Sequence, residues 1–181
     1  MKPKLSIGVS ILISLALVLF GLIFGTLSGF NDDRKQVTAL LSGESGLLNV
    51  LHYRGADGLN LAVVAKRHLS PADPDVQALE SAAQGLRNPQ GALIGKKQED
   101  GRLAAAVERV AAKLRDTPSF QASSRDRAYL DMLAADLEGL AASPVIAAYN
   151  QAAADFNKQL DTKTGGALAR LLGMQPCELY R

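Results

Sequence analysis

The stretch Ala147–Leu160, AAYNQAAADFNKQL, twice places an asparagine directly after an aromatic residue. Tyr149 and Asn150 form the first pair, and Phe156 and Asn157 form the second, seven residues later. Seven residues are about two helical turns, so both aromatic rings fall on one stripe of a helix and both amides on the next. Two interpretations are open: the amides fix the register of a neighbouring helix, or they form a polar seam that receives a partner.

Apolar stripes at helical spacing run through the rest of the chain, and no alternating β-branched stretch indicates a strand. The stripes are Val76, Leu79, Ala83 and Leu86; Leu103, Val107, Val110 and Leu114; Leu130, Leu133, Leu137 and Leu140; and Val145, Tyr149, Ala152, Phe156 and Leu160. This pattern predicts an all-α fold. We expect an antiparallel bundle of about four long helices over residues 31–181.

The first helix of this bundle is predicted from Asn31 to about Ser70. Asn31 suits an N-cap, and small residues along one seam would let another backbone approach closely. Glycine also weakens a helix, so a break within this stretch is an alternative. The glycines concerned are Gly43, Gly46, Gly55 and Gly58.

Proline marks several of the expected boundaries. Ser70-Pro71 predicts the start of a second helix, and Ser143-Pro144 predicts the start of the helix that carries the aromatic–amide pairs. The segment Arg87–Gly101, RNPQGALIGKKQEDG, is rich in glycine, proline and polar residues. We expect it to be a connection that is partly disordered.

An uncharged apolar run, LSIGVSILISLALVLFGLIFGTLSGF, occupies Leu5–Phe30. A helix of about 20 apolar residues crosses the hydrocarbon core of a bilayer, and this run is longer. A cleaved signal peptide is the alternative, but its apolar region would be shorter and would end at a small-residue site. Residues 1–30 are therefore predicted to form a single-pass transmembrane anchor, because no second run of this length follows.

Charges beside the run decide orientation only weakly. Lys2 and Lys4 precede it, and Arg34 and Lys35 follow it. Acidic residues count little in the positive-inside rule, so the two sides nearly balance. The amino group adds a slight preference for an inside N-terminus, which would place the bundle on the outer side of the membrane.

No residue pattern indicates catalysis or a bound metal or cofactor. His52 and His68 are too far apart for a zinc motif and are expected to be polar helix residues. Cys177 is the single cysteine, too isolated to indicate a nucleophile. The net charge of +2 provides no concentrated basic face for nucleic acid. We expect a protein that is not an enzyme.

The order of an N-terminal spanning helix and long helices, together with YNQAAADFN at residues 149–157, resembles the LemA family of bacterial membrane proteins. A gap-free comparison places Arg54 on a family arginine and Asn60 in the family's Asn-Leu pair. Leu59 stands where the family has proline, and Glu44 where it has tryptophan. The chain is thus similar to a divergent member of that family.

The resemblance implies a helical bundle anchored in the bacterial cytoplasmic (inner) membrane, on the periplasmic side by the slight charge preference. It implies a scaffold or adaptor of the cell envelope that binds an unknown protein partner, and self-association is left open. The alternatives are a regulator of a membrane protease or signalling kinase, an enzyme with an unrecognised site, or a secreted protein cleaved near Phe30. The residues that the resemblance implies for interaction are Tyr149, Asn150, Phe156, Asn157, Arg54 and Asn60.

Overall fold

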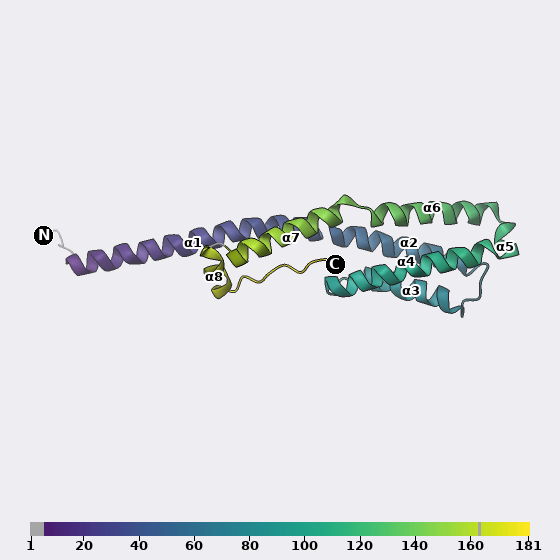
Figure 1. Ribbon diagram of the computed structural model, residues 1–181, viewed down its shortest axis with the longest axis horizontal. Coiled ribbons are helices and arrows are strands. Elements are labelled where there is room, and N and C mark those ends of the chain that lie inside the picture. Colours follow the sequence, from purple (N-terminus) through teal and green to yellow (C-terminus); the bar gives the residue numbers. More distant parts are fainter. Residues whose placement is uncertain (1–5, 163) are drawn as a thin grey trace. The chain divides into compact units, whose positions relative to one another are not determined.

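The computed structural model describes residues 6–162 and 164–181, and its regular elements are helices (Figure 1). In chain order they are α1 (Ile7–Ser42), α2 (Leu47–Ala65), α3 (Pro74–Arg87), α4 (Leu93–Arg115), α5 (Pro118–Gln121), α6 (Ser124–Ala141), α7 (Pro144–Thr162) and α8 (Thr164–Leu171). Within these described residues there is no strand. The all-α prediction is confirmed.

Contacts divide the chain into two compact units. Unit 1 contains residues 1–38 and 152–177, of which the structure describes 6–38, 152–162 and 164–177. Unit 2 contains residues 39–151 and 178–181. The boundary at residue 30 between an anchor and a bundle stays a prediction.

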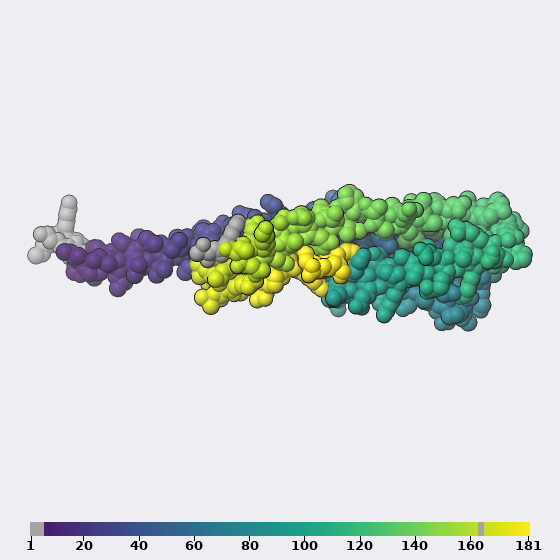
Figure 2. Space-filling model, viewed as in Figure 1, coloured from purple at the N-terminus to yellow at the C-terminus, as the bar shows by residue number. Residues whose placement is uncertain are grey.

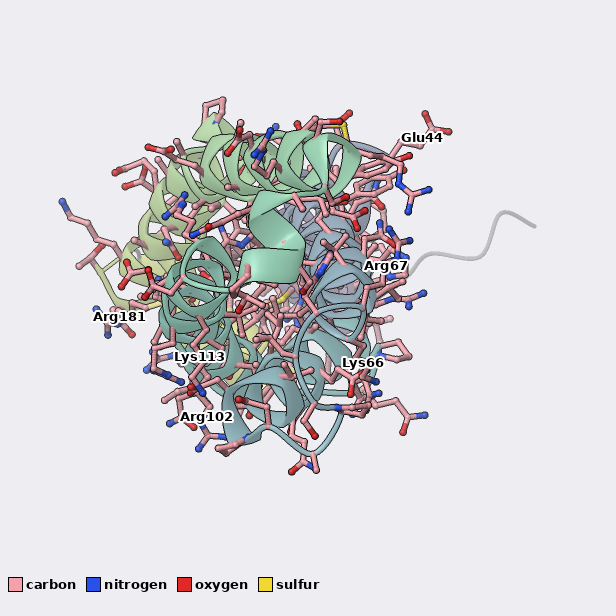
Figure 3. The ribbon with its side chains drawn as sticks, turned by 90° about the vertical axis from the view of Figure 1, so that its right-hand side faces the viewer. Glu44, Lys66, Arg67, Arg102, Lys113 and Arg181 are labelled. Atoms are coloured by element: carbon pink, nitrogen blue, oxygen red, sulfur yellow. The ribbon has the colours of Figure 1, made fainter. Side chains whose placement is uncertain are left out.

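Unit 2 is built from α2, α3, α4 and α6, and short connections make consecutive helices antiparallel (Figure 1). Its core consists of fully buried aliphatic side chains that include Leu51, Leu79, Leu103 and Leu130. The end-on view of Figure 3 shows charged side chains around the bundle, with Arg102 and Lys113 labelled at its periphery.

The predicted close approach at the small residues of α2 is confirmed. A Cβ atom on Gly55 would lie 2.6 Å from the carbonyl oxygen of Ala83 in α3. A Cβ atom on Gly58 would lie 2.7 Å from Cδ1 of Leu103 in α4. Since real side chains do not approach so closely, Gly55 lets the backbones of α2 and α3 come together, and Gly58 leaves room for the Leu103 side chain of α4.

Two predicted helix starts are wrong. Asn31 lies inside α1 and starts no helix. Residues 43–46 form a turn, so the alternative of a break near Gly43 and Gly46 is the one observed. The next helix starts at Pro74 rather than at Pro71, because Asp73 is its N-cap and accepts a hydrogen bond from the Asp75 N–H at 2.9 Å. Ser70 instead accepts one from the Ala72 N–H and makes a turn.

The segment Arg87–Gly101 was predicted to be a connection, and this is also wrong for most of its length. The connection spans only 88–92, and α4 begins at Leu93. The buried Lys96 donates hydrogen bonds from Nζ to the carbonyl oxygens of Leu86, at 2.9 Å, and Asn88. A side chain that was predicted to lie in a polar loop therefore caps the C-terminal end of α3.

The apolar stripes are buried with four exceptions, since Val107, Leu140, Val145 and Ala152 are only partly buried. Ala106 and Ala153 are fully buried beside the first and last of these. The predicted start at Ser143-Pro144 is confirmed, because α7 begins at Pro144.

Unit 1 joins the first part of α1 to the later part of α7, to α8 and to the segment 172–177. From Ile7 to Gly25 every residue of α1 is exposed, and burial begins at Thr26. The Phe30 ring meets the Phe156 ring edge-on, with 6.2 Å between centroids. On the face drawn in Figure 2, no other described segment covers the purple part of α1.

Two helical stretches among the described residues are long and apolar enough to cross a membrane by length and composition. Ile7–Ala65 has a window of mean hydropathy 2.8 with none of it buried, and Ser124–Thr162 has one of 1.2 with 17% buried. We expected only one run long enough to cross a membrane, and the structure contains a second, weaker candidate. The single-pass arrangement stays a prediction.

Candidate functional site

The C-terminal residues 178–180 are held by side chains of α4 and α7 within unit 2, and Arg54 of α2 pairs with the α4 carboxylate involved. Tyr180 is only 2% exposed. We call the following set the C-terminal clasp: Arg54, Asp100, Tyr149, Asn150, Glu178 and Tyr180.

Asn150 binds the C-terminal segment through both polar atoms of its amide. Its Nδ2 donates to the Tyr180 carbonyl oxygen at 2.9 Å, and its Oδ1 accepts from the Tyr180 N–H at 2.9 Å. The Tyr149 hydroxyl donates to the Glu178 carbonyl oxygen at 2.5 Å. The amide thus gives an extended segment the pair of backbone hydrogen bonds that a neighbouring strand would provide.

Glu178 binds the N-terminal end of α4. One carboxylate oxygen accepts from the Leu93 N–H at 3.1 Å and the other from the Ile94 N–H at 3.2 Å. Ala92 stands at the N-cap position of α4 and has no side-chain oxygen to offer. Glu178 therefore replaces a local cap and adds a negative charge at the positive end of the helix dipole.

Tyr180 contacts a buried charge pair formed by Arg54 and Asp100. The Tyr180 hydroxyl donates to Asp100 Oδ2 at 2.8 Å. The Arg54 Nε atom lies 2.8 Å from Asp100 Oδ1, at ion-pair distance although the two are not aligned as a hydrogen bond. Arg54 Nη1 donates to the Leu137 carbonyl oxygen of α6 at 2.9 Å. Arg54 thus connects α2, α4 and α6.

Burial, and then the Asp100 charge, raises the pKa of the Tyr180 phenol above its ordinary value. The phenol consequently stays protonated at physiological pH and remains a hydrogen-bond donor to Asp100. Lys97 Nζ lies 5.0 Å from the centroid of the same ring, within cation–π range. The clasp is an internally paired polar network.

The second aromatic–amide pair makes the same kind of bond within unit 1. Asn157 Nδ2 donates to the Cys177 carbonyl oxygen at 2.8 Å, and Asn157 Oδ1 accepts from the Cys177 N–H at 2.7 Å. Phe156 is buried against Phe30. The interpretation that the amides bind a neighbouring helix is wrong, because their partner is the backbone of the chain's own C-terminal segment.

Asn60 is not brought to the clasp. It is exposed on α2, where its side chain hydrogen-bonds Asp57, and it borders a groove of about 260 Å³ between α2 and α6. We call this surface the α2–α6 groove; its lining is Asn60, Val63, Val64, Arg67, Tyr129, Met132 and Leu133. Val63 is 55% exposed and Met132 is 49% exposed, so part of the groove is an apolar surface open to solvent.

A second polar cluster joins the end of α2 to α5 and α6, and the sequence did not indicate it. His68 Nδ1 lies 3.0 Å from Ser119 Oγ, and His68 Nε2 lies 2.9 Å from Asp126 Oδ2. The interpretation of His68 as a polar helix residue is wrong, since α2 ends at Ala65 and His68 follows in a turn. Its imidazole meets the Phe120 ring edge-on at 5.4 Å.

The order serine, histidine, aspartate is that of a hydrolase triad, in which serine is the nucleophile and histidine its base. This cluster differs from such a triad because its aspartate also pairs with Arg67, which is labelled in Figure 3. Its Nη1 lies 2.6 Å from Asp126 Oδ1, so the carboxylate charge is shared between a guanidinium and an imidazole. The hydrogen bond from His68, followed by the contacts with Arg67, lowers the pKa of Asp126 to about 2.

Other candidate groups stay separate. Asp131, Asp136 and Glu138 are exposed. Among the described residues, no group of three or more histidine, cysteine, aspartate or glutamate side chains could hold a metal ion. Cys177 is a partly buried free thiol, and burial raises its pKa.

Comparisons with protein-family models, with curated proteins and with solved structures find no match. The LemA resemblance therefore rests on the residues quoted for it.

Proposed function

We propose that this protein is a membrane-anchored helical scaffold or adaptor, held by α1 in the cytoplasmic membrane of a bacterial cell envelope. The exposed part of α1 carries the proposal. Ile7 is 81% exposed, Leu12 is 69% and Phe20 is 68%. Large apolar side chains exposed around a whole helix need an apolar surrounding, and a bilayer provides one.

The length of this part agrees with the proposal. At a rise of about 1.5 Å per residue, the stretch from Ile7 to Gly25 extends over about 28 Å, and a hydrocarbon core is about 30 Å thick. The weaker candidate, Ser124–Thr162, contains buried core residues such as Leu133 and Phe156. We assign that stretch to the folded part of the protein, which supports a single span.

The proposed scaffold role rests on how polar groups are used. The C-terminal clasp pairs its groups internally, and the α2–α6 groove offers apolar side chains together with Asn60 and Arg67. Such a mixed surface suits a protein partner better than a nucleic acid. The crosslinking experiment below identifies the partner and distinguishes another protein from a second copy of this chain.

Membrane extraction tests the anchor. Full-length protein is expressed, and membranes are washed with alkaline carbonate. The wild type should stay in the pellet, while the double variant Leu15→Arg/Leu19→Arg should be released because each central arginine costs about 2.5–3.5 kcal/mol on insertion scales. Val63→Arg, which adds charge to the groove, is the matched control and should stay in the pellet. Release of the wild type would contradict the proposal.

The groove is tested by placing a photo-crosslinking residue at Met132 in intact cells. A scaffold gives a discrete adduct that Tyr129→Asp abolishes, whereas a crosslinker at the exposed Gln77 of α3 gives none. Mass spectrometry of the adduct then separates an envelope protein from a second copy of this chain. Identical patterns from both positions would contradict a docking role for this groove.

A hydrolase is the second candidate function, and the alignment of Ser119, His68 and Asp126 favours it. Ser119 is exposed and could meet a substrate. A fluorophosphonate probe reacts with activated serines, so a hydrolase would label at Ser119 and lose the label in Ser119→Ala. Ser81→Ala, at an exposed serine of α3, is the control. Absence of labelling in the wild type would remove this candidate.

A further inference from the structure

Helix α8 meets α1 where the exposed part of α1 ends. Burial along α1 begins at Thr26. A Cβ atom on Gly165 would lie 3.0 Å from Thr26 Cγ2 and 3.7 Å from Phe30 Cε2, so the first turn of α8 touches α1 at this level. Glycine at position 165 permits that close approach.

The direction of α8 differs from that of α1. Figure 1 shows α8 turned across α1 where the two helices meet, and both helices belong to unit 1. If the exposed part of α1 crosses a bilayer, then Thr26 lies at its surface. Because α8 touches α1 at Thr26 and lies transverse to it, α8 extends along that surface.

One side of α8 is packed and the other is not. Ala169 is fully buried, whereas Leu171 is 83% exposed and Leu172 is 43% exposed. The helix ends there in a Schellman turn: Gly173, at φ 92°, donates from N–H to the Arg170 carbonyl oxygen, and the Met174 N–H donates to that of Ala169. The turn therefore presents two adjacent leucines to solvent, Leu171 almost fully and Leu172 in part.

We propose that α8 is an interfacial helix that inserts Leu171 and Leu172 into the boundary between headgroups and acyl chains of the bilayer that holds α1. This inference rests on the proposed membrane anchor. Amphipathic helices bury their apolar face about 5–10 Å into that boundary. Because α1 holds α8 at the surface, insertion of α8 is an intramolecular step with a high effective concentration of lipid.

A bilayer explains this patch better than a protein partner does. Two leucines on one turn make a surface far smaller than a stable protein interface, which buries about 800 Å² on each partner. A bilayer needs no complementary shape, and the helix that carries the two leucines touches α1 at Thr26, where the exposed apolar part of α1 ends. Every molecule inserted through α1 would bring the patch to lipid.

The chain contains no tryptophan, so a single introduced tryptophan reports its surroundings without a label. Three full-length variants are prepared in phosphatidylcholine–phosphatidylglycerol vesicles: Leu171→Trp, Phe20→Trp in the exposed part of α1, and Val63→Trp on α2. Vesicles with lipids brominated near the headgroup, or near the acyl-chain end, quench tryptophan at the corresponding depth. All three positions are exposed, so the substitutions leave the core unchanged.

The proposal expects the tryptophan at position 171 to be quenched at least twofold more by the shallow bromines than by the deep ones. Phe20→Trp should show deep quenching and Val63→Trp none. If Phe20→Trp is quenched while Leu171→Trp behaves as Val63→Trp does, the interfacial helix is wrong and the anchor stands. If Phe20→Trp is not quenched, the anchor is wrong and the interfacial helix fails with it.

Discussion

Arg54 is the side chain on which three helices of unit 2 depend. It is 4% exposed, and its guanidinium bonds Leu137 of α6 and faces Asp100 of α4. Replacing Arg54 by methionine would leave the Asp100 carboxylate buried without its countercharge. Such a loss costs about 3–5 kcal/mol. We expect Arg54→Met to lower the free energy of unfolding by that amount in urea titrations.

Arg102→Met provides the control for this change, because Arg102 is exposed and pairs with Glu99 on the same helix. Surface substitutions of this kind usually stay within about 0.5 kcal/mol. In the double variant Arg54→Met/Asp100→Leu neither charge of this buried pair remains, so stability should partly return. Equal losses from Arg54→Met and Arg102→Met would contradict the role given to Arg54.

Asp126 makes stability depend on pH in a defined direction. His68 and Arg67 hold its pKa near 2 in the folded chain, below the ordinary value of about 3.9 in an unfolded chain. The unfolded state therefore binds the proton more tightly, and the stabilisation is complete above about pH 4 and is lost as the pH falls toward 2. Arg125, which lies 3.3 Å from Asp126 Oδ1, acts in the same direction.

Thermal unfolding of the wild type and Asp126→Asn between pH 7 and pH 2 checks this expectation. The wild type should be more stable at neutral pH, and the difference in melting temperature should shrink below pH 4. Asp131→Asn alters an exposed carboxylate on the same helix and should show no such convergence. A constant difference down to pH 2 would mean that the charge of Asp126 is not what stabilises the cluster.

At this scale the sequence predicted which residues matter better than it predicted what they bind. The repeat of Tyr149-Asn150 and Phe156-Asn157 indicated two equivalent bonds, and the structure has them. Their partners, the backbones of Tyr180 and Cys177, leave no signal, because a backbone group carries no residue identity. His68 was missed for a related reason: Ser119 and Asp126 are distant in sequence and close only after folding.

Among the helices, α2 and α3 pack so closely that the absence of one side-chain carbon, at Gly55, is required. A methyl group on Gly55 would press against the Ala83 carbonyl oxygen and the Arg87 side chain. Overpacking of this kind costs about 1–3 kcal/mol, and the Ala83 backbone cannot move aside without moving α3. We expect Gly55→Ala to be destabilised by that amount in denaturant titrations.

Gly139→Ala is the matched control, since a Cβ atom there meets nothing within 4 Å inside α6. Alanine is the better helix former by about 0.5–1 kcal/mol, so this variant should gain stability. The two substitutions are chemically identical and should have opposite signs. A gain in both would show that α2 and α3 are not held at this distance.

The start of α4 depends on a residue 85 positions away in sequence, Glu178. Glu178→Ala should cost about 0.5–2 kcal/mol, the usual effect of losing an N-terminal cap. The loss should be local, so amide hydrogen exchange should accelerate at Leu93 and Ile94 more than at Leu103 in the same helix. Glu108→Ala, at an exposed position of α4, is the control. Uniform acceleration along α4 would contradict a capping role.

The same dependence explains why helix boundaries were the least predictable elements. Pro144 starts α7 as its sequence indicates, because the signal is local. Leu93 starts α4 through Glu178, and Lys96 closes α3 from the following helix. Local composition therefore made the segment Arg87–Gly101 resemble a loop. Helix existence followed from apolar periodicity, whereas these ends were set by tertiary contacts.

For the whole molecule, the C-terminal segment matters because the chain passes between the two units at residues 38–39, 151–152 and 177–178. Asn157 binds Cys177 in unit 1, and Asn150 binds Tyr180 in unit 2. The two aromatic–amide pairs thus serve one segment on either side of a unit boundary. A membrane topology probe placed in this segment has to take these bonds into account.

Cys177 is the single thiol and would report membrane orientation without engineering, but its environment slows it. The thiol is partly buried and burial raises its pKa, so less of the reactive thiolate is present at neutral pH. We expect a membrane-impermeant maleimide to label native Cys177 at least tenfold more slowly than a cysteine at the exposed Ser70, placed in a Cys177→Ser background. Labelling rates of detergent-solubilised protein measure this ratio.

The Ser70→Cys/Cys177→Ser protein then decides the side of the membrane. With an inside N-terminus and a single span, intact spheroplasts should label at Ser70→Cys as fast as opened ones do, because the bundle lies outside the cytoplasmic membrane. Labelling only after opening would place the bundle in the cytosol and reverse the predicted orientation. Asn157→Ala in the native-cysteine protein links this test to the fold. Loss of its two bonds to Cys177 should speed labelling of that thiol, while an unchanged rate would mean that the C-terminal segment is not held there.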